Sequence, residues 1–302
     1  MTAVAALLAL TVATAPAAAP APRGAPLLWR VEKYGKTSHL FGTVHLALDL
    51  DAALGEEGRT ALANAKRVFL ELDFAPENLM EFLGQAVARA ELPEKDSLRA
   101  LLRPKSWNRL ADATKGRIDP ALLDRLQPWF VALWVVHLAV PRAPQPGAVR
   151  PGLPPLDQQI DARARARKIP IEALESRLEH LQVMSRMDRK EGVAMVEEAL
   201  ARTDGDRAEF AGLVNAYVAE QDRPLMKTFG RLVRRKPALA ERLLFRRNEA
   251  WIERLERWLG DGRMFVAAGT FHMFGERGLV ALLRARGYRV ERVRAASSPR
   301  SQ

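Results

Sequence analysis

The sequence predicts an α/β (α+β) fold whose mixed central sheet is built from two related halves. Each half reads as a strand, a Gly-x-x-His motif and a helix, with Gly42-Thr43-Val44-His45 near the start and Gly269-Thr270-Phe271-His272 near the end. Between them, at about residues 76–155, apolar residues follow a helical period and predict a helical insertion. The chain has 302 residues, 48% of them hydrophobic, so we expect residues 24–302 to form a single domain.

Three strands are expected in the first half. Residues 27–32 and 38–42 flank a glycine turn at 34–36, a pattern typical of a strand pair. Residues 67–73 read as the next strand, with Glu71 on the face opposite Val68, Leu70 and Leu72. A carboxylate inside such an apolar run is costly to bury unless it is paired or bound to a metal. Glu71 is therefore a candidate functional residue.

The second half alternates between helix and strand patterns. A helix is expected to begin at residue 156, and a short strand at about 169–175 ends at Glu175, on the loop side of the sheet. Single helical stretches are expected at about 178–202 and 207–233. After them we expect a long helix, a strand, a helix and a closing strand, at residues 237–259, 263–268, 278–286 and 288–293.

A polar residue interrupts the apolar face of the long helix at 237–259. That face consists of residues spaced three or four apart, namely Leu244, Asn248, Trp251, Leu255 and Leu259. Buried polar groups are normally hydrogen-bonded, so Asn248 should have a specific partner, and Arg247 could reach the same region. Two interpretations stay open: a functional role, or a hydrogen bond from helix to sheet that carries no chemistry.

The charge of the chain does not by itself identify a partner. The formal net charge is +11, and there is no cysteine, which excludes disulfides and thiolate metal sites. A basic chain can bind nucleic acid or anionic surfaces, or it can simply carry solvated arginine-rich helices. No nucleic-acid-binding motif accompanies the charge, so we expect no nucleic-acid partner.

The N-terminus resembles a signal peptide. Residues 3–15 form an apolar run of alanine, valine and leucine, followed by an alanine- and proline-rich stretch to about residue 23. The run has the length of a signal-peptide core and is short for a membrane span, so we expect cleavage near Ala17 and a periplasmic or secreted protein without a stable membrane span. No Lys or Arg precedes Arg23; a misassigned start codon and a disordered leader are the alternatives.

Four candidate side chains are expected at one edge of the sheet. His45, Glu71, Glu175 and His272 all lie at or near strand ends, and open α/β sheets bind ligands beyond the carboxyl ends of their strands. Two imidazoles with one or two carboxylates suit Zn, Mn, Co or Fe, with positions left for water. A glutamate beside such a metal could serve as the base that activates the water.

The motifs together resemble the TraB/GumN (TraB/PrgY/GumN) family. The resemblance covers nearly all of residues 27–293 and is specific as a set. It is carried, in order, by Leu40-Phe41-Gly42-Thr43-Val44-His45-Leu46, Leu70-Glu71-Leu72-Asp73, Leu156-Asp157, Leu174-Glu175, Arg247-Asn248 and Gly269-Thr270-Phe271-His272. The family is similar to the metal-dependent Tiki proteases and, more distantly, to erythromycin-esterase-like and haem-binding ChaN-like proteins.

This resemblance implies a divalent-metal hydrolase site that uses His45 and His272. Glu71 matches the acidic residue of the family, as a metal ligand or as the base, and Arg247 and Asn248 match its Arg-Asn pair. The match is looser for Asp157 and Glu175. His180 stands where relatives have glutamine, and it receives no role.

Three functional hypotheses follow. The first is a metal-dependent hydrolase, a peptidase acting outside the cytoplasm on a peptide or protein substrate, with Mn, Co or Zn held by His45, His272 and Glu71. The second is a non-catalytic protein that binds a peptide, a metal or haem in the same cleft; the absence of Cys and of clustered Met-His ligands makes haem the weaker version. The third gives both motifs a purely structural role and predicts two histidines that lie far apart.

Overall fold

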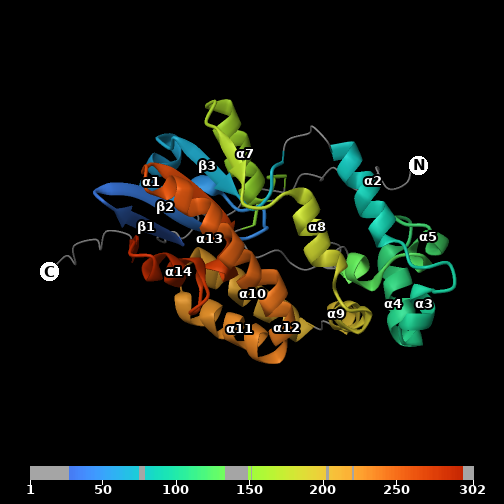
Figure 1. Cartoon of the computed structure of the whole chain (residues 1–302). Helices are drawn as coiled ribbons and strands as arrows, with labels where there is room; N and C mark the ends of the chain where they lie inside the picture. The colour runs from blue at the N-terminus through green and yellow to red at the C-terminus, as the bar shows by residue number, and fades with distance from the viewer. Residues whose placement is uncertain are drawn as a thin grey trace. The chain divides into compact units, whose positions relative to one another are not determined.

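A mixed sheet unites strands from the first, middle and last parts of the chain (Figure 1). The computed structural model describes residues 27–74, 79–132, 149–150, 152–201, 204–219 and 221–294. Among these residues the sheet has six strands in the order β4-β3-β5-β2-β1-β6. Their bounds are β1 (Leu28–Lys33), β2 (Lys36–Thr43), β3 (Arg67–Leu70), β4 (Ile171–Ala173), β5 (Met264–Gly269) and β6 (Arg289–Arg292). The predicted mixed α/β fold is confirmed. The expected signal peptide lies outside the described residues.

The chain divides into two compact units. Within the described parts, the first is drawn from Ala75–Gln145 and Arg177–Ala211. The second, which contains the sheet, is drawn from Ala13–Phe74, Pro146–Ser176 and Gly212–Gln302. The helical segment expected at about 76–155 falls largely in the first unit, which also takes in the helices that follow residue 176.

The first unit is helical in its described residues. Its helices are α2 (Leu79–Ala90), α3 (Leu98–Leu101), α4 (Pro104–Thr114), α5 (Pro120–Asp124), α8 (Arg177–Ser185) and α9 (Arg189–Ala201). Helix α2 packs against α8, and α4 packs against α9. Arg103, just before α4, forms an ion pair with Glu197 on α9, which joins the two parts of the unit.

Strand direction decides where the candidate site lies. β2, β3 and β4 each run parallel to a neighbour, with β5 paired to both β2 and β3. The carboxyl ends of these four strands therefore meet at one edge of the sheet. β1 and β2 form the expected antiparallel pair, and β1 also pairs antiparallel with β6. Central β5 is buried along almost its whole length, as is typical of a strand covered on both faces.

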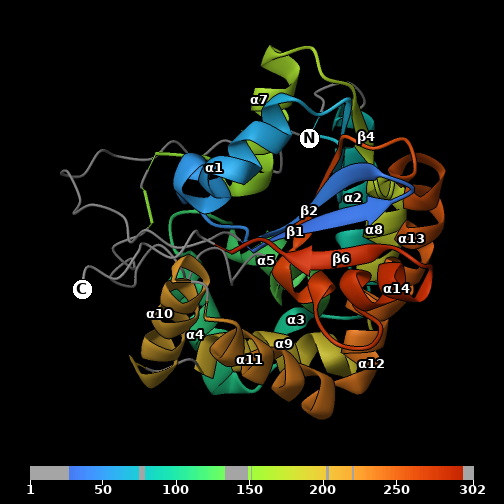
Figure 2. The same ribbon diagram turned by 90° about the vertical axis from the view of Figure 1, so that its left-hand side faces the viewer.

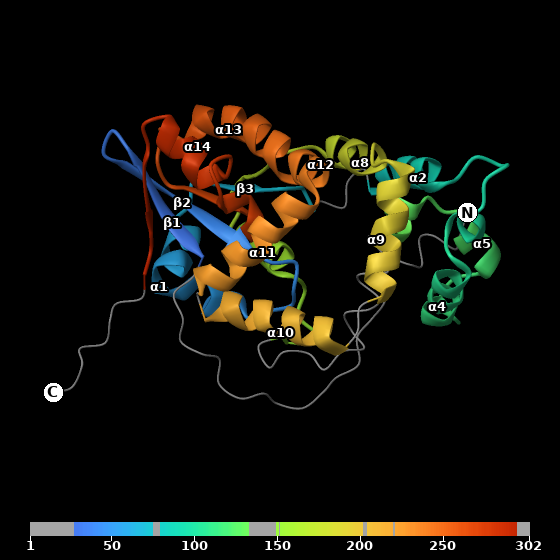
Figure 3. The ribbon, with the colours of Figure 1, turned by 90° about the horizontal axis from the view of Figure 1, so that it is seen from below.

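Helices cover both faces of this sheet (Figures 2 and 3). On one face lie α1 (Leu50–Ala63) and α7 (Leu156–Ala166), which contact each other. On the other lie α13 (Arg246–Leu259) and α14 (Leu279–Ala285), also in mutual contact. α13 presents the predicted apolar face to the core, with Trp251 and Leu255 almost fully buried.

Two expected strands are shorter than predicted. The strand expected at 67–73 ends at Leu70, so Glu71 follows the strand and does not lie inside it. The Gly269 N–H, at the end of neighbouring β5, donates to the Glu71 carboxylate at 2.6 Å. The Glu71 side chain thus takes the place of the next backbone hydrogen bond between β3 and β5. The strand expected at 169–175 is reduced to β4, and Glu175 again lies just beyond its end.

Three expected helices are interrupted. The stretch at 178–202 forms α8 and α9, because Asp188 accepts a hydrogen bond from Lys190 N and so starts a new helix. The stretch at 207–233 forms α10 (Asp204–Val218) and α11 (Asp222–Arg235). Pro224 lies in the first turn of α11, where an N–H has no partner within the helix in any case.

The helix expected at 237–259 changes its winding partway. It begins as α12 (Pro237–Ala240), passes through a π-helical turn, η3 (Glu241–Phe245), and continues as α13. Single π turns inside helices are often found at functional sites. This turn ends two residues before Arg247. Among the described residues, no helix is both long enough and apolar enough to cross a membrane.

Candidate functional site

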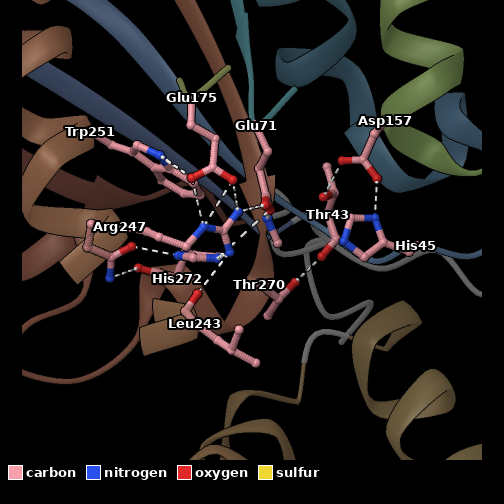
Figure 4. Close-up of polar contacts among 12 residues, drawn as sticks. Thr43, His45, Glu71, Asp157, Glu175, Leu243, Arg247, Trp251, Thr270 and His272 are labelled. Carbon is pink, nitrogen blue, oxygen red and sulfur yellow. Dashed lines mark hydrogen bonds and ion pairs between the residues drawn. The ribbon is translucent and has the colours of Figure 1, made fainter. Parts of the chain in front are cut away.

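Four candidate side chains lie at the shared carboxyl edge of the parallel strands (Figure 4). His45 follows β2, Glu71 follows β3 and Glu175 follows β4. His272 lies in a single 3-10 turn, η4 (Thr270–Met273), directly after β5. All four belong to the unit that contains the sheet.

Arg247 lies among three of these side chains. Its Nε and Nη2 donate to Glu175 at 2.8–3.2 Å, and Nη2 also donates to Glu71 Oε2 at 2.6 Å. Nη1 donates to the Leu243 carbonyl at 2.8 Å and to His272 Nε2 at 3.1 Å. All five N–H groups of the guanidinium are therefore used. The side chain is only 7% exposed, so these bonds are shielded from water.

Asn248 fixes the orientation and tautomer of His272. Its amide nitrogen donates to the carbonyls of His272 and Arg277, at 3.3 and 2.8 Å. The amide oxygen must then accept, so the His272 Nδ1–H donates to Asn248 Oδ1 at 2.6 Å. His272 Nε2 is left with a lone pair, which accepts from Arg247. The specific partner predicted for Asn248 is thus present, and Asn248 is fully buried.

Trp251 closes one side of this cluster. Its indole lies over both the Arg247 guanidinium and the His272 ring, with separations of 4.5 and 4.4 Å from the indole centroid. The indole N–H also donates to Glu175 Oε2 at 3.3 Å. A cation over a tryptophan face is stabilised by the ring quadrupole. The spacing of Trp251 matches the apolar stripe and predicts only a position in the core, so its contacts with Arg247 and His272 are not predictable from the sequence.

His45 is held by Asp157 on α7. Asp157 Oδ2 accepts from the His45 Nδ1–H at 2.8 Å, and Oδ1 accepts from the Thr43 hydroxyl at 2.6 Å. Asp157 is buried, whereas the His45 side chain is 65% exposed. One imidazole nitrogen is therefore fixed by a carboxylate, and among the residues that the structure describes the other nitrogen makes no hydrogen bond and could serve a ligand. This arrangement is typical of both catalytic and metal-binding histidines.

The two Gly-Thr-x-His motifs are joined by a hydrogen bond. The Thr270 hydroxyl donates to the Thr43 carbonyl at 2.8 Å. Thr43 and Gly269 are paired residues of β2 and β5, so the motifs leave the sheet side by side. Threonine stands at the same position of both motifs, as Thr43 and Thr270, but the sequence alone does not indicate what it does. Gly42 leaves little space for a side chain, because an added Cβ would lie 3.2 Å from the Thr270 hydroxyl and 3.3 Å from Leu27 Cβ, so these neighbours would have to move.

Tyr217 on α10 supports the first motif. Its buried hydroxyl donates to the Gly42 carbonyl at 2.8 Å. We expect Tyr217→Phe to lower the free energy of unfolding by about 1–2 kcal/mol, since the carbonyl loses its donor while remaining buried. Urea unfolding measures this change. Tyr34→Phe is the matched control, because Tyr34 is 86% exposed, and it should leave stability unchanged. Equal effects of the two substitutions would contradict the role of Tyr217.

The two histidines have opposite pKa shifts. The hydrogen bond to Asp157 raises the pKa of His45 to about 9, and the charge of Glu71 acts in the same direction. Burial lowers the pKa of His272 to about 3, despite the opposing attraction of Glu71. At neutral pH, His45 is therefore an imidazolium and His272 is neutral. The charge of His45 also acts to lower the pKa of His272, so both histidines belong to one electrostatic cluster.

Glu71 is held as a carboxylate. Burial alone would raise the pKa of Glu71, but His272 and Arg247 beside it outweigh burial, and the pKa falls well below its usual range. Its two oxygens accept from Gly269 N and Arg247. A carboxylate with so low a pKa is a weak proton acceptor. The geometry therefore favours an anchoring role for Glu71 over the role of base.

A comparison with known families covers almost all of the described chain. Residues 27–292 match the model of the TraB/PrgY/gumN family. The chain belongs to this family. Two curated relatives are both named "Uncharacterized protein YbaP". The one from Shigella flexneri is 25% identical over 255 residues, which cover 82% of this chain and 88% of that protein. The one from Escherichia coli (strain K12) is 24% identical over 254 residues, covering 82% and 87%.

The metal expected for a TraB/PrgY/gumN site does not fit the present arrangement of donors. Among the described residues, no three His, Asp or Glu groups converge on one position that could hold a metal ion. His272 Nε2 faces the Arg247 guanidinium, and the carboxylates of Glu71 and Glu175 bind the same group. In this arrangement Arg247, and not a metal ion, is held by these donors.

Proposed function

We propose that this TraB/PrgY/gumN protein is a hydrolase that cleaves peptide bonds, with His45 as the group that transfers the proton. The observation that carries the proposal is the hydrogen bond between His45 and Asp157. It orients an imidazole that is otherwise mostly exposed, beside a buried cluster of charged residues. The resemblance to the Tiki proteases favours peptides as the substrate class.

The charge state of His45 suggests general acid catalysis. The imidazolium Nε2–H donates its proton to the leaving nitrogen as the bond between carbonyl carbon and nitrogen breaks. Water supplies the oxygen that bonds to the carbonyl carbon, and a proton from that water restores the imidazolium. The products are a carboxylic acid and an amine. Asp157 stabilises the imidazolium and keeps Nδ1 protonated, so that Nε2 remains the exchanging atom.

The buried cluster supports this chemistry by fixing the strand ends. Glu71 binds Gly269 N, and Thr270 binds the Thr43 carbonyl, so the position of the first motif depends on the second. In this proposal Arg247, Glu175 and Asn248 position other side chains and transfer no proton. A catalytic group held by packed strands and hydrogen bonds keeps its geometry more reliably than one on a free loop.

A peptide library tests the proposal. The purified protein is incubated with the library, both after EDTA treatment and with added Mn²⁺, Co²⁺ or Zn²⁺, and the products are identified by mass spectrometry. We expect cleavage, and a fall in kcat of about 10²–10⁴-fold in His45→Ala, the usual contribution of a proton-transferring side chain. His39→Ala is the control, because His39 lies on β2, the strand that His45 follows, but binds Glu57.

The pH profile gives a sharper expectation. Since only the imidazolium can donate, kcat should fall as the pH rises through the His45 pKa of about 9. Asp157→Asn removes the carboxylate that raises this pKa, so the fall should move toward the ordinary histidine value of about 6.5. NMR titration of the His45 ring measures the same shift without any substrate.

Two results would overturn the proposal. Turnover that survives His45→Ala would exclude His45 as the proton donor. Tight binding of peptides without cleavage under any metal condition would favour the alternative, a non-catalytic binding protein.

We also propose export to the periplasm or the medium, on the strength of the apolar and alanine/proline-rich leader. N-terminal sequencing of the mature protein from its own host should find a start near residue 18. An intact N-terminus would contradict export by cleavage.

A further inference from the structure

We propose that the Arg247 guanidinium occupies the position that a divalent metal would take in this site, so that the native protein uses an internal cation in place of a metal ion. The inference deepens the proposed function and rests on it for its catalytic meaning. Its test measures metal binding and needs no turnover.

The donor atoms around Arg247 are those that a metal would use. The guanidinium contacts two carboxylates and one imidazole lone pair, from Glu71, Glu175 and His272. Two carboxylates and a neutral imidazole form a typical ligand set for Mn²⁺, Co²⁺ or Zn²⁺. The Asn248 oxygen holds the opposite nitrogen of His272, as an outer hydrogen-bond partner does for a metal-bound histidine.

The guanidinium fills this position completely. Its Nη2 bridges Glu71 and Glu175, its Nη1 takes the His272 lone pair, and the Trp251 ring covers its face. A metal at the same donors would have to displace the guanidinium and leave a buried arginine without its carboxylate acceptors. Removing one partner of a buried ion pair is strongly unfavourable, so Arg247 resists displacement.

Arg247 balances part of the negative charge at this position. Glu71 and Glu175 carry two negative charges, which Arg247 reduces to one. The second cation of the site, His45, pairs with Asp157 at the neighbouring strand end. When Arg247 is removed, both buried carboxylates lose the guanidinium between them. A divalent cation would then match their charge and find the His272 lone pair free.

Metal binding before and after removal of Arg247 tests the inference. Wild-type protein and Arg247→Ala are first treated with EDTA and dialysed. The Tm of each protein is then measured with or without MnCl₂, CoCl₂ or ZnCl₂. In parallel, metal-treated samples are dialysed again, and elemental analysis measures the metal that they retain. The wild type should retain no stoichiometric metal, and its Tm should not change with metal. Arg247→Ala should melt lower without metal and regain about 5–10 °C at metal concentrations near 100-fold above Kd.

Two further variants control for fold and for surface binding. Arg247→Lys keeps a positive charge and should respond to metal much less than Arg247→Ala. Arg254→Ala removes another arginine of α13, one that donates to the Leu174 carbonyl, and it should behave as the wild type does toward metal. A metal response shared by Arg254→Ala and Arg247→Ala would assign the binding to the surface and overturn the inference.

The wild type alone can also overturn the inference. One metal ion per chain that survives dialysis, or a wild-type Tm that rises with metal, would show that Arg247 does not replace the ion; this result holds even when Arg247→Ala fails to fold. The outcome is separate from that of the proposed function. A metal-free wild type that cleaves no peptide would support this inference and contradict the proposed hydrolase function. Cleavage by a metal-loaded wild type would support the hydrolase function and contradict this inference.

Discussion

Glu175→Ala is expected to lower the free energy of unfolding by about 3–5 kcal/mol, because it leaves the buried Arg247 guanidinium without its main acceptor. Glu175 accepts from Arg247 Nε and Nη2 and also from the Trp251 indole, and its side chain is 6% exposed. Glu71 alone cannot replace these bonds. Urea unfolding followed by tryptophan fluorescence measures the loss.

Glu172→Ala is the matched control for this substitution. Glu172 lies on β4, three residues before Glu175, and it forms an ion pair with Arg67. Its side chain is 45% exposed, so removing it should cost no more than about 1 kcal/mol. If Glu175→Ala were as mild as Glu172→Ala, the buried network around Arg247 would not stabilise the fold.

Acid should destabilise the protein because of His272. The pKa of His272 is lowered to about 3 in the folded protein from its ordinary value of 6.5, mainly by burial. Between these values the unfolded chain binds a proton that the folded protein does not. The free energy of unfolding therefore falls as the pH drops below 6.5, by about 1.4 kcal/mol per pH unit and about 5 kcal/mol in full.

Other groups act on different parts of the pH range. His39 also has a lowered pKa, mainly through burial, and it adds to the loss on the acid side. Glu71, whose pKa is lowered, adds a further loss only as the pH falls below the ordinary glutamate range. His45 acts in the opposite direction, since its raised pKa gives stability that is lost as the pH rises from 6.5 to about 9. Stability should peak near pH 6.5.

A variant isolates the contribution of His272. Unfolding free energies are measured at half-unit steps between pH 5 and 6.5, above the range in which carboxylates titrate. His272→Gln should reduce the mean slope over this range by about 1 kcal/mol per pH unit relative to the wild type, because the unfolded histidine is only half protonated at pH 6.5. Thr270→Val alters the same turn without removing a titratable group, so it should lower stability but keep the wild-type slope. Equal slopes for the wild type and His272→Gln would contradict a neutral, buried His272.

Local pattern was enough to predict much of the sheet. The glycine turn at residues 34–36 and the apolar runs beside both Gly-x-x-His motifs predicted β1, β2 and β5, because side-chain alternation and turn residues act over a few positions. The polar Asn248 on an apolar stripe predicted a buried hydrogen bond, and its partner is His272. Helix interruptions were harder to predict, because capping at Asp188 and the π turn before Arg247 depend on single bonds.

The sequence by itself determined which residue types follow the parallel strands: two histidines after glycine turns, and two glutamates after short apolar runs. Only the tertiary structure decided what each of them contacts. Partners such as Asp157 and His45 lie 112 positions apart, and Glu71 and Arg247 lie 176 apart, so no local pattern can relate them. The packing of α13 against the sheet brings an arginine to the centre of the carboxylates, where the spacing of the motifs had suggested a metal ion.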